Sequence, residues 1–132
     1  MKTLRLLLAC GLLLLTRGAL AAEPTEATAT TFLAHYEQIR AALADDNLSA
    51  AQAAAKALPE AKAVAAAASI TDARKAFKAL STQAVGLARG RPGFFIAHCS
   101  MFPGGADWVQ TTDQLSNPYW GKSMPHCGEL VK

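Results

Sequence analysis

The 132-residue sequence is poor in cysteine, with three in all. No two of them form a Cys-x-x-Cys pair, the motif of thioredoxin-like redox proteins and, with a following histidine, of c-type haem attachment. The chain also lacks a long internal repeat. Its longest apolar run, Leu6 to Leu15, is shorter than the roughly 20 residues that a membrane-spanning helix needs. These absences argue against a disulfide oxidoreductase, a c-type cytochrome and a protein with a stable membrane span.

The N-terminus has the pattern of a secretory signal peptide. Lys2 and Arg5 precede the apolar run, and Ala19-Leu20-Ala21 is a small-residue cleavage pattern. A lipidation site at Cys10 is the weaker alternative, because most of the apolar run follows that cysteine. We therefore expect an exported protein, released by cleavage of its signal peptide.

Cleavage changes the charge balance. Lys2, Arg5 and Arg17 are lost from the 13 basic residues, leaving 10, whereas all 10 acidic residues remain. The mature chain then has no net charge, and electrostatic binding to nucleic acid loses its support.

We divide the chain into a signal peptide at residues 1–22, a polar linker at 23–31 and one helical domain at 32–132. Removal of Cys10 leaves Cys99 and Cys127 as the cysteines of the exported chain. An exported pair of this kind either oxidises or is protected by a ligand.

Four helices are predicted before residue 90. Apolar residues at helical spacing, namely Phe32, Tyr36, Ile39 and Leu43, predict a first helix over about 31–44. A second follows the capping oxygens of residues 45–47, and a third begins at Pro59. A fourth, capped by Thr71 or Asp72, ends before Gly90. Because alanine dominates these segments, we expect a thin core.

The character of the sequence changes after Gly93. Turn signals at 103–105 and 117–118 mark an irregular segment, in which "FFIAH" and "DWVQ" could pair as a short β-hairpin. Trp108, Tyr119 and Trp120 are expected to pack this end of the domain. The predicted fold is therefore mainly all-α, a three- or four-helix bundle with an irregular C-terminal segment.

Two clusters in that segment contain soft metal donors. "AHCSMFPGG" contains His98, Cys99 and Met101, and "SNPYWGKSMPHCGEL" contains Met124, His126 and Cys127. Thiolates and thioethers together suit Cu(I), and imidazole is acceptable to copper and zinc. Thioethers are poor ligands for hard ions, so calcium and magnesium are disfavoured.

A disulfide between the two cysteines is the competing interpretation. Closing a loop of that length would stabilise the fold by roughly 3.5 kcal/mol in the chain-entropy description. The methionines would then be core filler. From spacing alone the two interpretations stand about even, and either histidine alone is more often a surface residue than a ligand.

Longer stretches around these clusters carry a wider pattern. "YEQIRAALADDNLSAAQAAAKAL" and "ARKAFKALS" come first, followed by "HCSMFPGGADWVQ" and "NPYWGKSMPHCGEL". The last two contain Cys-x-Met, Trp, Asn-Pro-Tyr-x-Gly and Met-x-x-Cys-Gly, in that order. In these stretches, over nearly the whole mature chain, the sequence resembles the family called domain of unknown function 3347. That family occurs as small exported bacterial proteins and on the periplasmic adaptor subunits of heavy-metal RND efflux pumps.

The resemblance implies copper or heavy-metal handling in the periplasm. It picks out Cys99, Met101, Met124 and Cys127 as copper ligands, with the two neighbouring histidines as further candidates. Ser100 departs from the family pattern, which often has proline there, so the loop is expected to be less rigid.

The expected function is that of a periplasmic Cu(I)-binding chaperone or scavenger connected with metal resistance or efflux, with Cu(II) and Ag(I) as further ions. The alternative is a disulfide-stapled helical domain that docks an envelope or efflux-pump protein. No catalytic activity is expected, because a cysteine beside a histidine in sequence has neither a positioned base nor an oxyanion site.

Overall fold

The computed structural model describes residues 22–131. The predicted signal peptide lies, except for Ala22, outside the described residues. The helices are α1 (Glu26–Ala44), α2 (Leu48–Ala55), a 3₁₀ turn η1 (Pro59–Ala61), α3 (Lys62–Ala65) and α4 (Ile70–Ala88). After them come β1 (Phe95–Cys99), β2 (Ala106–Gln110), a second 3₁₀ turn η2 (Gly121–Ser123) and β3 (Glu129–Val131).

The expectation of a mainly helical bundle is wrong, because the three strands form an antiparallel sheet in the order β2-β1-β3 and the fold is mixed α/β. The hairpin of β1 and β2 agrees with the pattern in the sequence, Cys99 pairing with Ala106. The third strand did not show in the sequence. It has only three residues, too few for an alternating pattern, and it pairs with a strand about thirty residues earlier.

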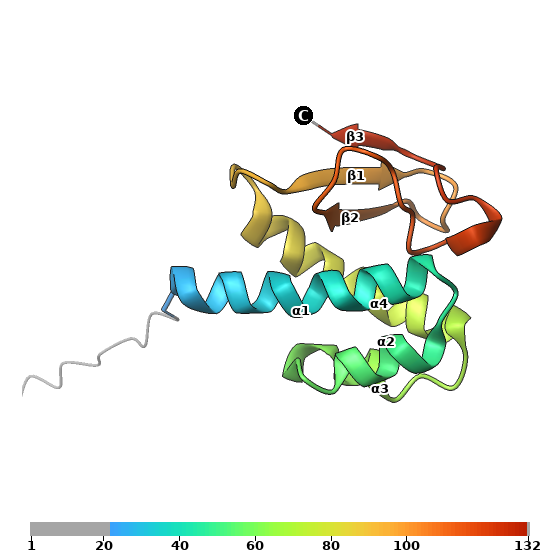
Figure 1. The fold of residues 1–132 in the computed structure, drawn as a ribbon, viewed down its shortest axis with the longest axis horizontal. Helices are drawn as coiled ribbons and strands as arrows, with labels where there is room; N and C mark the ends of the chain where they lie inside the picture. The colour runs from blue at the N-terminus through green and yellow to red at the C-terminus, as the bar shows by residue number, and fades with distance from the viewer. Residues whose placement is uncertain (1–21, 132) are drawn as a thin grey trace, which may run out of the picture.

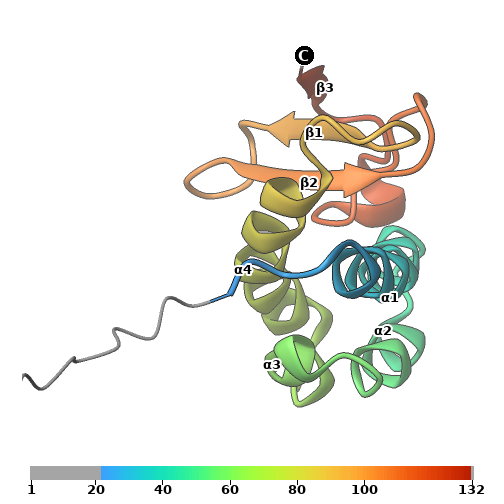
Figure 2. The same cartoon turned by 90° about the vertical axis from the view of Figure 1, so that its left-hand side faces the viewer.

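The sheet lies at one end of the molecule, with α1 and α4 next to it and α2 and α3 on the far side (Figures 1 and 2). β2 is the strand nearest to the helices, whereas β3 is the edge farthest from them. The long connection from β2 to β3 returns beside the sheet and carries η2. In the part of the chain described, no helix is both long and apolar enough to cross a membrane.

The first helix begins earlier than expected. Thr25 caps α1 by accepting a hydrogen bond from the N–H of Thr28, so most of the stretch assigned to a linker is helical. The hydroxyls of Thr30 and Thr31 donate to carbonyls one turn back, so both are hydrogen-bonded within the helix. The cap of α4 is Ser69 rather than Thr71 or Asp72.

Aromatic side chains connect the helices to the sheet. Tyr36 of α1 stacks on Phe77 of α4 with ring centroids 5.0 Å apart, and Phe77 lies 5.8 Å from Tyr119. The Tyr36 hydroxyl is 2.8 Å from the Ser81 hydroxyl and accepts a hydrogen bond from the N–H of Val109. The predicted stripe of α1 is thus confirmed as core, and its tyrosine joins α1, α4 and β2.

Arg74 ties the C-terminal segment to the helical layer. Its Nε donates to the carbonyl of Pro118, and its Nη2 donates to the carbonyl of Leu43 and to Asp46. Gly121 lies against this ion pair with a φ of 57°, and a Cβ added there would overlap both Asp46 and Arg74. Only glycine fits that position without disturbing the ion pair.

We expect Gly121→Ala to lower the free energy of unfolding by about 2 kcal/mol or more, through the left-handed backbone and displacement of the ion pair. Gly86→Ala is the matched control, because Gly86 lies within α4 and a Cβ there meets nothing within 4 Å. That variant should gain about 0.5–1 kcal/mol. Denaturant unfolding measures the free energy of unfolding of both variants. Equal stabilities of Gly121→Ala and Gly86→Ala would contradict this description of Gly121.

Candidate metal centre

The two cysteines meet where β1 ends and β3 begins. Cys99 is the last residue of β1, and Cys127 precedes β3 by two residues. Their Sγ atoms are 3.5 Å apart and both are free thiols. Gly128 makes this approach possible, because its φ is 127° and a Cβ there would lie 2.6 Å from the carbonyl oxygen of His98.

Met101 completes a group of three sulfurs. Its Sδ lies 3.6 Å from the Sγ of Cys127. Cys99 is fully buried, Cys127 is partly buried and Met101 is 61% exposed. We call Cys99, Met101 and Cys127 the sulfur cluster; it runs from the interior to the surface of the protein.

Asn117 holds the chain around the cluster. Its side-chain amide donates to the carbonyl of Cys127 at 2.7 Å, while its Oδ1 accepts from the N–H groups of Tyr119 and Trp120. Its backbone N–H also donates to the carbonyl of Pro125. The buried amide therefore fixes the turn after it and the position of Cys127 together.

The surroundings of the two thiols push their pKa values apart. Burial by itself raises the pKa of Cys99, but hydrogen bonds from Cys127, from the N–H groups of Phe102 and Met101 and from Asn117 lower it below its ordinary value. The pKa of Cys127 is raised, first by its hydrogen bond to Cys99 and then by desolvation and the negative charge of the Cys99 thiolate. The buried sulfur is thus the one prepared to be a thiolate.

The geometry suits one soft ion. Metal–thiolate bonds are about 2.3 Å long, so three sulfurs in a plane around one ion lie roughly 4 Å apart. The two measured sulfur–sulfur distances, 3.5 and 3.6 Å, need only a small expansion to reach this value. Within residues 22–131, no three His, Cys, Asp or Glu side chains gather closely enough to bind an ion. The thioether of Met101 is therefore what supplies a third donor here.

Met124 is linked to the cluster through its backbone. Its carbonyl accepts a hydrogen bond from the N–H of Cys127, and its side chain is partly buried. The contacts between side chains link the sulfurs of three of the four residues that the resemblance picks out, and Met124 stays a predicted ligand.

Neither neighbouring histidine joins the sulfurs in this structure. His98 alternates with Cys99 along β1, and its Nδ1 lies 2.6 Å from the carboxylate of Asp107. The Nδ1 of His126 lies 2.7 Å from the carbonyl oxygen of Leu115. Each therefore has one ring nitrogen engaged outside the sulfur cluster.

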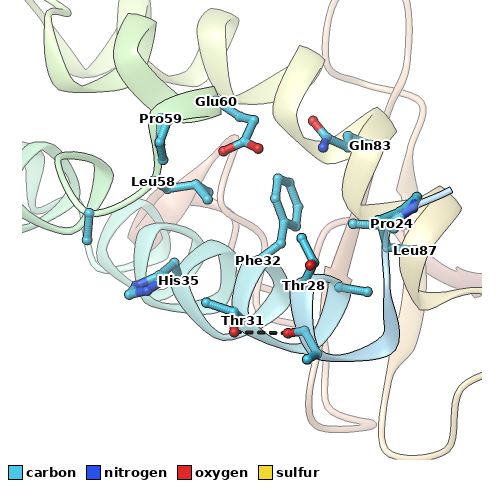
Figure 3. A pocket seen from close by; sticks show the side chains of 13 residues that line it. Pro24, Thr28, Thr31, Phe32, His35, Leu58, Pro59, Glu60, Gln83 and Leu87 are labelled. Carbon is cyan, nitrogen blue, oxygen red and sulfur yellow. Dashed lines mark hydrogen bonds between the residues drawn. The ribbon is translucent and has the colours of Figure 1, made fainter. Parts of the chain in front are cut away.

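The remaining histidine, His35, lines a separate groove of about 480 Å³ between α1, the residues after α2, and α4 (Figure 3). Phe32, Leu58, Gln83 and Leu87 form much of its wall. No residue of the sulfur cluster contributes to it.

Sequence reasoning missed the importance of Asn117 and Gly128, although both lie in quoted motifs. The signal was present for Asn117, because an Asn-Pro pair favours a turn in which the amide binds nearby backbone. Gly128 shows its role only through contact with β1.

Comparisons with protein-family models, curated proteins and solved structures found no match to this chain. The family resemblance therefore stays a prediction, and the interpretation of the sulfur cluster as a metal site rests on its geometry.

In the reduced, metal-free protein we expect the thiol pair to titrate in two steps, one below and one above the ordinary cysteine pKa of about 8.5. Cys127→Ala should raise the pKa of Cys99, because a hydrogen bond to its thiolate is lost. Cys99→Ala should lower the pKa of Cys127. The ultraviolet absorbance of the thiolates against pH measures all three proteins, and one two-proton step at the ordinary value would contradict the assigned contacts.

Proposed function

We propose that this chain is a periplasmic Cu(I)-binding protein, a chaperone or scavenger connected with metal resistance or efflux, and not an enzyme. The single observation that carries the proposal is the sulfur cluster, in which two thiols and a thioether lie within 3.6 Å of their neighbours between the interior and the surface of the protein. The pattern of the N-terminus and the family resemblance support the location and the link to efflux.

The chemistry of the donors favours Cu(I). Soft sulfur ligands select Cu(I) over harder ions, and a structural zinc site would use four cysteine or histidine donors rather than a thioether. Removing a thiolate from water is costly unless its charge is compensated. The N–H groups near Cys99 supply part of that compensation, and a bound cation would supply the rest.

The gradient of exposure supports transfer of the ion. Met101, the outermost donor, is 61% exposed. A donor atom from another protein could replace this thioether while the cysteines still hold the ion. A closed structural site would offer no such route.

The separation of the cysteines also favours a second candidate state. An Sγ–Sγ distance of 3.5 Å exceeds the disulfide bond length of about 2.05 Å, yet rotation of the partly buried Cys127 side chain could close the gap. Oxidation would then give the disulfide-stapled docking domain. Because both states use the same sulfurs, oxidised protein should not bind copper, and bound copper should protect the thiols from alkylation.

The reduced mature protein should bind about one Cu(I). Each of Cys99→Ser and Cys127→Ser should bind Cu(I) much more weakly, with a loss greater than the roughly 10–100-fold that follows mutation of residues hydrogen-bonded to metal ligands. Competition with a Cu(I) chelator measures this. His98→Gln is the matched control and should bind as the parent does, because His98 pairs with Asp107. Unchanged affinity in either cysteine variant would rule out the shared site.

The two methionines should contribute differently to Cu(I) affinity. Met101→Leu should lower Cu(I) affinity by about tenfold or more, equivalent to ~1.4 kcal/mol, because its thioether lies 3.6 Å from the Cys127 thiol. Met124 is linked to Cys127 through its backbone carbonyl, so Met124→Leu should have the smaller effect. Leucine conserves volume, so each variant should lose less than about 1.5 kcal/mol of stability. Chelator competition and thermal unfolding test both. Equal Cu(I) binding by Met101→Leu and the parent would show that Met101 is not a ligand.

A further inference from the structure

A second pocket lies between α4 and the C-terminal segment, outside the sulfur cluster. Its volume is about 510 Å³, within the range of small-molecule sites. Basic and aromatic side chains make up most of its wall: Arg74, Lys75, Lys78, Phe102, Tyr119 and Trp120. We call this the α4 pocket.

The charged residues that line the α4 pocket are all basic, and none of its lining residues is acidic. The side chain of Lys75 is 70% exposed, and its ammonium forms a long ion pair of 4.0 Å with the carboxylate of Asp72. Lys78 donates to the carbonyl of Pro103 at 3.2 Å, and an ammonium group has two further N–H donors. Both lysines therefore keep N–H donors that can bind an anion.

One buried donor on the pocket wall lacks a partner. The Nε1 of Trp120 is buried and has no hydrogen-bond partner among the described residues. A buried donor without an acceptor costs about 1–3 kcal/mol, so a ligand acceptor that reaches this nitrogen would relieve a cost already present. Arg74 uses Nε and Nη2 for its protein contacts, which leaves its Nη1 to donate to a ligand.

The walls of the pocket are aromatic. Phe102 lies 4.6 Å from Tyr119 and 6.4 Å from Trp120, measured between ring centroids. Such surfaces prefer an offset or edge-on aromatic partner. An inorganic anion would satisfy the donors but leave these rings uncovered.

We propose that the α4 pocket binds a small aromatic carboxylate, with its ring against Phe102, Tyr119 and Trp120 and its carboxylate toward Arg74 and the lysines. This site is independent of copper. It uses none of the three sulfurs, and its test is made on metal-free protein.

Phenylacetate is the probe. We expect saturable binding at millimolar concentration, followed in ¹H–¹⁵N spectra by a shift of the indole N–H signal of Trp120. Trp108 is an internal control, because its Nε1 already donates to the buried side chain of Gln110 at 2.8 Å. Its signal should not move. Absence of saturation, or an equal shift of both indoles, would overturn the proposal.

Ligand analogues on the unaltered protein test each part of the assignment. Phenylacetamide keeps the ring without the charge, and acetate keeps the carboxylate without the ring. Each should bind at least about tenfold more weakly than phenylacetate. If phenylacetamide bound as tightly as phenylacetate, the cations would have no role in binding. If acetate bound as tightly as phenylacetate, the aromatic wall would have none.

Lys78→Met should weaken phenylacetate binding by about tenfold, because it removes a charged donor while keeping an apolar stem. Lys62→Met, in α3 and outside this pocket, is the matched control for net charge and should bind as the parent does. Equal losses in the two variants would show a general charge effect and overturn the site.

Discussion

An asparagine side chain with no exposed surface holds three parts of the C-terminal segment together. The amide of Asn117 uses its oxygen for the turn at Tyr119 and Trp120 and its nitrogen for the carbonyl of Cys127. A buried amide left unpaired would be destabilising, so these hydrogen bonds reinforce one another. The aromatic contacts, the sulfur cluster and the α4 pocket all involve residues that this one side chain positions.

The antiparallel sheet supplies the second constraint. Cys99 and Cys127 are 28 residues apart in sequence and meet because β3 pairs with the same strand that carries Cys99. Gly128 permits the close approach, and the turn after Cys99 brings back Met101 and the N–H groups that favour a thiolate. The sulfurs are thus arranged by the backbone before any ion arrives, which limits the reorganisation needed for binding.

Much of the helical half could be predicted, because each of its features is local. The stripe of Phe32, Tyr36, Ile39 and Leu43 is buried, and Asn47 caps the second helix as the capping rule expects. The hairpin of β1 and β2 was visible for the same reason.

What escaped prediction depends on contacts between distant segments. β3 is too short to show a pattern, and without it the fold reads as a helical bundle, which is wrong. The hydrogen bond from Arg74 to Pro118 links residues more than forty positions apart. Trp120 and the lysines of α4 are as far apart in the sequence, yet they line the same pocket. Spacing in the sequence identified the sulfur residues, but only the folded chain shows that Met101 lies beside Cys127 and that His98 lies beside Asp107.

The central claim is that copper would be held by sulfur alone, by the two cysteines and Met101, while His98 and His126 keep their present partners. The most direct test is the copper K-edge X-ray absorption spectrum of the reduced protein loaded with one equivalent of Cu(I). The account predicts a first coordination shell of sulfur atoms without the multiple-scattering pattern of imidazole. A shell containing histidine nitrogen would contradict it.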